Sequence, residues 1–119
     1  MKFKSKKDKE QYNSLGGEYA SESNLLLRQF IDVLEAITVM LGLSELVITS
    51  YIRKDNIYSL HYYGRALDIR VWDHPVIWYW AMTLIGMAIT LIDSRFRMNP
   101  HTELYGKPQQ HIHIEIRDK

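Results

Sequence analysis

The final segment of the chain constrains the fold more than any other, because HIHIEI at residues 111–116 alternates polar and apolar side chains without interruption. Successive side chains of a β-strand point to opposite faces, so this pattern predicts a strand with three isoleucines in a core. The opposite face then carries three ionisable groups in a row, from His111, His113 and Glu115. Such a strand needs a sheet beside it and polar surroundings in front of it.

A second alternation, over residues 65–71, predicts another half-buried strand. Its aliphatic residues would face the core, and Asp68 would point away from it. The stretch 46–52, LVITSYI, is short and rich in β-branched residues, which is typical of a buried strand. A polar loop, RKDN at 53–56, follows this strand, and a loop also carries His61.

An amphipathic helix is predicted between these strands and the start of the chain. Ser21 or Ser23 can cap its N-terminus, and Gly42 is a suitable residue for its end. Spacings of four, three, four and four residues predict one buried face, made of Leu26, Phe30, Val33, Ile37 and Leu41.

A second helix is predicted over residues 76–92, a run without any charged residue. Pro75 suits its first turn, and Asp73 is the expected N-cap. The run could be a membrane span, as in a small membrane protein, but it is at the short end of the length that spanning needs. We therefore expect a buried helix, with only one residue of the aromatic run WYW at 78–80 in contact with solvent.

The composition limits the possible chemistry. A chain of 119 residues with 46% hydrophobic residues suits one domain, and a net charge of +1 disfavours nucleic acid as the partner. Because there is no cysteine, any metal must be held by His, Asp or Glu. We expect a basic flexible segment over residues 1–20, which lacks the apolar stretch of a secretion signal, and a single domain over 21–119. Synthesis in the cytoplasm is therefore expected.

Two predicted strands and one loop thus present ligand-type side chains. Two imidazoles and one carboxylate, with water in a fourth position, form the open zinc site used in hydrolysis. Residues two apart on a strand stand about 7 Å apart, so both histidines of HIH could face one site, although only one need bind the metal. His74 and His101 each lie beside a proline, and we expect them at the surface.

The stretch SLHYYGRALDIR at residues 59–70 resembles the S-x-H-x-x-G-x-A-x-D motif of zinc D-Ala-D-Ala carboxypeptidases, vancomycin-resistance dipeptidases and phage L-alanyl-D-glutamate endopeptidases. The closing HIH is similar to the H-x-H signature of that wider group, which includes hedgehog domains. The resemblance extends from about Val47 to Glu115. It implies an α+β fold with a small antiparallel sheet flanked by helices, hedgehog/D-Ala-D-Ala peptidase-like.

The resemblance also implies roles for individual residues. His61, Asp68 and His113 would be the Zn²⁺ ligands, and Arg53 would hold a substrate carboxylate. Many members carry an acid at the position of Gln110, so His111 is the expected general base, with Glu103 and Glu115 in reserve. Ser59 is expected to hold the loop rather than act as a nucleophile, while Tyr51 and Ile52 depart from the family pattern beside Arg53.

The expected function is therefore zinc-dependent hydrolysis of peptide bonds in peptidoglycan, by a monomer that acts on the cell wall after release, as a phage lytic enzyme does. The bond cleaved and the choice between endopeptidase and carboxypeptidase action stay open. The alternative is a catalytically weak or inactive metal-binding protein of the same fold, and Gln110 is the residue that favours it.

Overall fold

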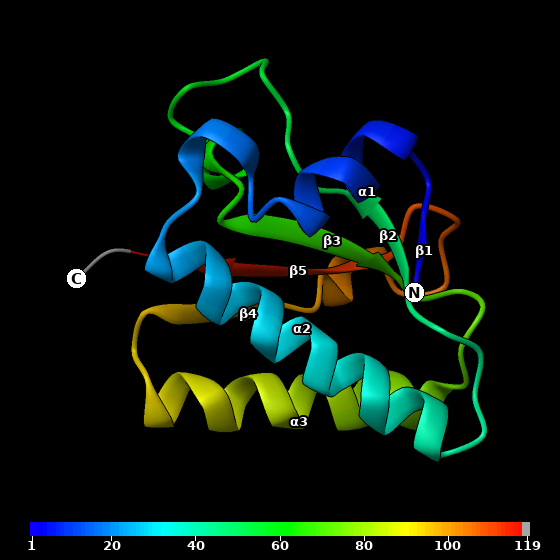
Figure 1. The fold of residues 1–119 in the computed structure, drawn as a ribbon. Coiled ribbons are helices and arrows are strands. Elements are labelled where there is room, and N and C mark those ends of the chain that lie inside the picture. The colour runs from blue at the N-terminus through cyan, green and yellow to red at the C-terminus, as the bar shows by residue number, and fades with distance from the viewer. Residues whose placement is uncertain (118–119) are drawn as a thin grey trace.

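Five strands form one mixed sheet in the order β1-β2-β3-β5-β4 in a computed structural model that describes residues 1–117 (Figure 1). Residues 118 and 119, the last two of the expected domain, lie outside the described residues. The strands are β1 (Lys2–Phe3), β2 (Val47–Ser50), β3 (Ala66–Arg70), β4 (Phe96–Asn99) and β5 (His111–Ile116). The helices are α1 (Lys6–Asn13), α2 (Glu22–Met40) and α3 (Val76–Ile92), and the 3₁₀ turns are η1 (Gly17–Tyr19), η2 (Leu60–Tyr63) and η3 (Thr102–Leu104).

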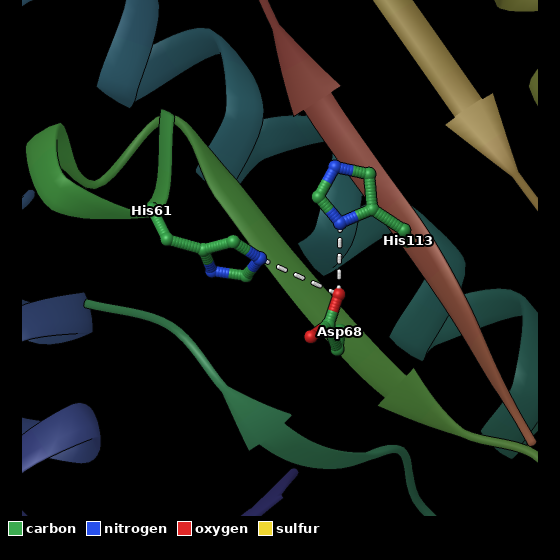
Figure 2. Close-up of side chains that lie close together, drawn as sticks. All are labelled: His61, Asp68 and His113. Atoms are coloured by element: carbon green, nitrogen blue, oxygen red, sulfur yellow. Dashed lines mark hydrogen bonds and ion pairs between the residues drawn. The ribbon is translucent and has the colours of Figure 1, made fainter. Parts of the chain in front are cut away.

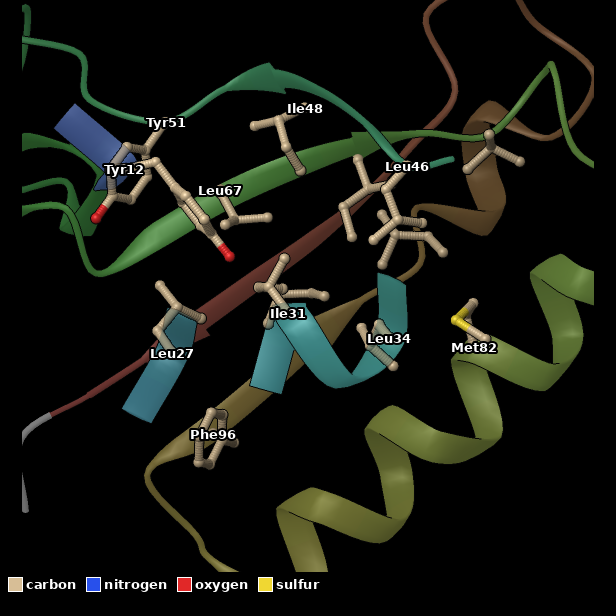
Figure 3. Close-up of a cluster of buried hydrophobic side chains, with 14 of the residues drawn as sticks. Tyr12, Leu27, Ile31, Leu34, Leu46, Ile48, Tyr51, Leu67, Met82 and Phe96 are labelled. Carbon is tan, nitrogen blue, oxygen red and sulfur yellow. The ribbon is translucent and has the colours of Figure 1, made fainter. Parts of the chain in front are cut away.

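The core lies between the sheet and the pair of helices α2 and α3, which cover one side of it (Figure 1). The aliphatic residues of β3 and β5 point into this core, as their alternation predicts. Figure 3 shows side chains of α2 and α3 meeting those of β2 and β3 there. The predicted α+β class and the three predicted strands are confirmed. The opposite face of β3 and β5 is left for the polar residues.

The N-terminal segment corrects the sequence analysis, because residues 1–20 are not a flexible extension. β1 pairs in parallel with β2, so the sheet is mixed rather than purely antiparallel. In α1, Tyr12 is buried in the core and donates a hydrogen bond to Asp32 of α2 at 2.8 Å. A lysine-rich segment can therefore fold against the domain through a few apolar side chains between its charges.

Helix α2 forms where it was predicted, with the Ser21 hydroxyl accepting from the Asn24 N–H. Its buried face is nevertheless different: Val33 and Leu41 are exposed, and Leu26, Phe30 and Ile37 are only partly buried. The buried positions are Ser23, Asn24, Leu27, Ile31, Leu34 and Thr38. The predicted phase was wrong because apolar residues crowd much of the helix, beginning with three successive leucines at 25–27.

Helix α3 confirms the prediction of a helix from residue 76 to residue 92, but Pro75 rather than Asp73 is its N-cap. Asp73 instead accepts a hydrogen bond from Arg70 at 3.1 Å. Within the run 78–80, the first two rings are buried and Trp80 is exposed, as expected. No helix within residues 1–117 combines the length and hydropathy that a membrane crossing requires.

Candidate metal centre

The register between β3 and β5 brings the first two site residues together. Asp68 lies directly opposite His113 across this antiparallel pair. Both residues occupy the strand face that points away from the core, so their side chains project in the same direction. His113 Nδ1 is 2.9 Å from Asp68 Oδ1, although the two residues are 45 positions apart in the sequence.

The third side chain, His61, comes from the 3₁₀ turn η2. The Ser59 hydroxyl accepts a hydrogen bond from the His61 N–H at 3.2 Å and caps this turn, which is the loop-holding role expected of it. Gly64 ends the turn with φ +69°, and a Cβ there would lie about 3 Å from the Tyr51 hydroxyl and the Asn24 amide. The glycine of the motif therefore permits both the backbone conformation and the close approach.

Asn24 fastens this turn to the rest of the domain. Its buried Nδ2 donates to the carbonyl of Tyr63 at 3.0 Å, and to those of Leu15 and Tyr19 at 2.8 and 3.1 Å. The N-terminal segment thus helps to position His61, a connection that the sequence motif does not contain.

The three side chains point toward one another from η2, β3 and β5 (Figure 2). The buried His61 ring donates from Nδ1 to the Tyr51 carbonyl at 2.7 Å, which fixes its tautomer. Its Nε2 is buried without a hydrogen-bond partner and lies 3.5 Å from Asp68 Oδ1. A buried nitrogen lone pair aimed at a carboxylate is unfavourable unless a proton or a cation lies between them.

His113 is oriented from its other side by Glu115. Its Nε2 donates to Glu115 Oε1 at 2.8 Å, and Arg117 Nε donates to the second oxygen of that carboxylate. A carboxylate behind a ligand imidazole is the usual outer contact of metal-binding histidines, because it fixes the ring and increases its basicity.

In the site, opposite charges and hydrogen bonds shift the pKa values of Asp68 and His113 more strongly than burial does. Burial alone would raise the pKa of Asp68, but the hydrogen bond and charge of His113, with the nearby His61 imidazole, hold it well below its usual range. Burial would lower the pKa of His113, yet its bonds to Asp68 and Glu115 raise it. Without a metal ion, this raised pKa favours a proton on each nitrogen of His113, one facing each carboxylate.

The donor set fits a small divalent cation. Zinc with bonds of about 2.1 Å and tetrahedral angles separates its ligand atoms by about 3.4 Å. One atom from each of His61, Asp68 and His113 lies within 4.8 Å of the other two, so small side-chain shifts reach that geometry. Two neutral imidazoles and one carboxylate leave a fourth position for water or substrate. This group can bind a metal ion.

Other histidines surround the group. His111 donates from Nδ1 to the Gln109 carbonyl, and its Nε2 lies 3.9 Å from Asp68 Oδ1, beside the candidate ligands. The ring centroid of His101 is 4.2 Å from that of His111, and its Nδ1 is 2.7 Å from Glu103. The sequence analysis missed this closeness, since it depends on the loop between β4 and β5.

His74 and Gln110 both lie in the interior. His74 is buried rather than exposed, because it donates to the Ser44 carbonyl at 2.8 Å and stacks on Trp78. Gln110 is also buried, and its Oε1 accepts from the Gly106 N–H at 3.1 Å.

Arg53 and the surface beside His113 complete the region. The Arg53 backbone N–H donates to the His61 carbonyl at 3.4 Å, while its side chain is exposed. A groove of about 410 Å³ opens next to the ligand group and is lined by Tyr58, Ser59, Leu60, His113, Glu115 and Arg117. A peptide-sized molecule bound in this groove would contact His113 directly.

Fold and site together define an α+β domain with a His-Asp-His group on the face of its sheet that points away from the core. No family model, curated protein or solved structure matches the chain.

Proposed function

We propose that this chain is a zinc-dependent peptidase that cleaves peptide bonds in peptidoglycan stem peptides or cross-links. The observation that carries the proposal is the convergence of His61, Asp68 and His113. These are the three residues that the motif resemblance assigns as Zn²⁺ ligands. The hedgehog/D-Ala-D-Ala peptidase-like fold is part of the same proposal, and a phage lytic enzyme is the biological setting that it favours.

His61 Nε2, Asp68 Oδ1 and His113 Nδ1 would hold the ion. Tyr51 and Glu115 keep the two imidazoles turned toward it, through the bonds at their outer nitrogens. When bound, zinc would supply a Lewis acid that lowers the pKa of water and polarises a substrate carbonyl.

Proton transfer and substrate binding fall to other residues. His111 lies beside the ligands, and its Nε2 can accept a proton from the attacking water and return it to the leaving amine. The Arg53 backbone N–H is hydrogen-bonded to the His61 carbonyl, and the Arg53 side chain can pair with a substrate carboxylate. The groove beside His113 would hold the peptide chain.

A second candidate is a metal-binding protein of the same fold with little or no turnover. The buried amide of Gln110, which bonds to Gly106 in place of the acid that many family members carry, favours it. The two candidates share the metal site and differ in the proton acceptor.

Digestion of defined muropeptides by zinc-loaded protein, with products identified by mass, tests the first candidate. We expect hydrolysis by the wild type and none by His113→Ala, which should also lose zinc in equilibrium dialysis. His111→Ala should keep zinc and lose at least about a hundredfold in rate, since a positioned base contributes roughly that much.

His101→Ala is the matched histidine control and should bind zinc like the wild type. Zinc binding by the wild type without any cleavage of muropeptides would favour the second candidate. Failure to bind zinc, or binding that survives His113→Ala, would contradict both.

A further inference from the structure

The outer face of α3 is apolar and exposed along its whole length. Its side chains Ile77, Trp80, Leu84, Met87 and Leu91 are between 47% and 89% exposed. They follow one another at spacings of three, four, three and four residues. This is the pattern by which one helix packs against another helix, and we call these five residues the α3 seam.

The seam lies opposite the buried side of the helix, which faces the sheet through Trp78, Tyr79, Met82 and Gly86. A groove of about 500 Å³ lies beside the C-terminal half of the helix on the side of α2, with Phe30, Val33 and Ile89 among its walls. A second groove, of about 400 Å³, follows it on the side of β4. The C-terminal half of the seam is therefore a ridge between two apolar grooves, into which side chains of a second helix can pack.

We propose that the α3 seam pairs with the α3 seam of a second copy of this chain, the two helices lying antiparallel about a two-fold axis at Leu84. This arrangement places Ile77 near Leu91 of the other copy and the large Trp80 ring near the flexible Met87. A parallel arrangement would instead put the two Trp80 rings against each other.

The available area agrees with a stable dimer. The seam and its neighbours Val76 and Ile92 expose on the order of 900 Å², counting about 200 Å² for a fully exposed large side chain. Stable interfaces bury about 800 Å² on each partner.

The charges favour a second copy over a membrane surface. α3 has no charged residue, so two copies meet without repulsion. Binding to an anionic membrane needs a rim of basic residues, whereas α2 and α3 contain no lysine and a single arginine, Arg28. Arg97, which lines the groove on the side of β4, donates to the carbonyls of Ser94 and Phe96. Arg28 is already engaged by Asp32 and the Asn13 carbonyl.

The metal centre would stay open in such a dimer, because it lies on the face of the sheet that α2 and α3 do not cover (Figure 1). The dimer therefore does not depend on the proposed function, and circular dichroism checks the folding of the variants whether or not zinc binds.

Sedimentation velocity over a range of concentrations tests the dimer. We expect a dimer for the wild type and a loss of at least roughly a hundredfold in dimer affinity for Leu84→Glu, which would bury two carboxylates at the axis. Ile57→Glu changes an exposed apolar residue and should dimerise normally. Its loop, between β2 and β3, lies across the sheet from α3 (Figure 1). Both variants should keep the wild-type circular dichroism spectrum and zinc binding.

The absence of cysteine allows a second test of the geometry. Leu84→Cys should form a disulfide-linked dimer on oxidation, because residues at the axis meet each other. Leu91→Cys should not, since the two copies of residue 91 would stand about 21 Å apart along the helices.

The proposal would be overturned by a monomeric wild type, by a dimer whose affinity Leu84→Glu leaves unchanged, or by efficient cross-linking of Leu91→Cys. If the wild type is a monomer and binds phosphatidylglycerol vesicles in a way that Leu84→Glu abolishes, the partner of the α3 seam is a membrane surface and not a second copy.

Discussion

Glu115 lies two residues beyond His113 on the same face of β5. Its Oε1 accepts a hydrogen bond from His113 Nε2 at 2.8 Å. This contact decides which nitrogen of the ring faces Asp68. With Nε2 occupied, only Nδ1 is available to a metal ion, and the ring cannot turn without losing a charge-assisted hydrogen bond.

Replacing Glu115 with glutamine should therefore weaken the metal site without removing a ligand. The neutral amide oxygen is a poorer acceptor, and losses of outer contacts to ligand histidines typically cost ten- to a hundredfold in metal affinity. We expect a decrease of about tenfold for Glu115→Gln in competition with a zinc chelator. Glu10→Gln, on the exposed side of α1, provides the control, and an unchanged affinity in both variants would contradict the orienting role.

Metal affinity should fall as the solution becomes more acidic. The pKa of His113 is raised by Asp68 and Glu115, so the metal-free site holds a proton on Nδ1 at higher pH than an ordinary histidine. A metal ion must displace that proton, and below the pKa of His113 the dissociation constant should rise about tenfold for each pH unit. Calorimetric titrations from about pH 5 to pH 8 measure this slope, and a flat profile would mean that His113 is not a ligand.

The metal-free protein should show its own pH dependence of stability. Asp68 has a pKa below its ordinary value of 3.8, so its contribution is present above that value and is lost as the pH falls further. His113 has a pKa above its ordinary value of 6.5, so its contribution is complete below 6.5 and is lost as the pH rises through the folded-state pKa.

The ion pair should therefore stabilise the fold most between about pH 4 and pH 6.5. Urea unfolding of chelator-treated protein measures the effect, and Asp68→Asn should flatten the profile. A wild-type profile identical to that of Asp68→Asn would contradict the pairing.

Removal of the proposed zinc ion should lower the melting temperature. A ligand at a hundred times its dissociation constant stabilises the native state by about 2.7 kcal/mol, which in a domain of this size corresponds to roughly 10 °C. We expect that shift on chelation and its reversal on adding zinc back. His113→Ala should melt at the same temperature with and without zinc; a zinc-dependent shift in that variant would place the ion elsewhere.

The parts of the fold that the sequence predicts correctly depend on short-range alternation. In β5 a polar residue follows every apolar one, and in β3 Leu67, Asp68, Ile69 and Arg70 alternate, so the strand faces and the outward direction of Asp68 and His113 follow directly from the order of residues. Contacts between residues far apart in the sequence were harder to predict. The buried His74 is hydrogen-bonded to the carbonyl of Ser44, 30 positions away, and nothing near His74 in the sequence indicates that contact.

Helix phase and the N-terminal strand failed for different reasons. Apolar residues crowd α2 from Leu25 to Leu41, so several faces satisfy a helical period and only packing against the sheet selects one. β1 is two residues long and lies in a lysine-rich segment, and its pairing with β2 leaves no periodic signal. The turn that aims His61 is visible as a motif, yet its attachment through Asn24 is visible only in three dimensions.

A buried polar pair inside the core provides a test of the packing between the two large helices. Trp78 of α3 donates from its indole nitrogen to the Thr38 hydroxyl of α2 at 2.9 Å, and that hydroxyl donates to the Leu34 carbonyl at 2.8 Å. Thr38→Val keeps the shape of the side chain but leaves the buried indole N–H without an acceptor, which should cost about 1–3 kcal/mol of unfolding free energy.

Thr38→Ser is the matched variant, because it keeps the hydroxyl and loses one methyl group. It should therefore be less destabilised than Thr38→Val in urea unfolding, although valine is the more hydrophobic residue. The opposite order would mean that methyl packing, rather than the bond to Trp78, determines the stability of this contact between α2 and α3.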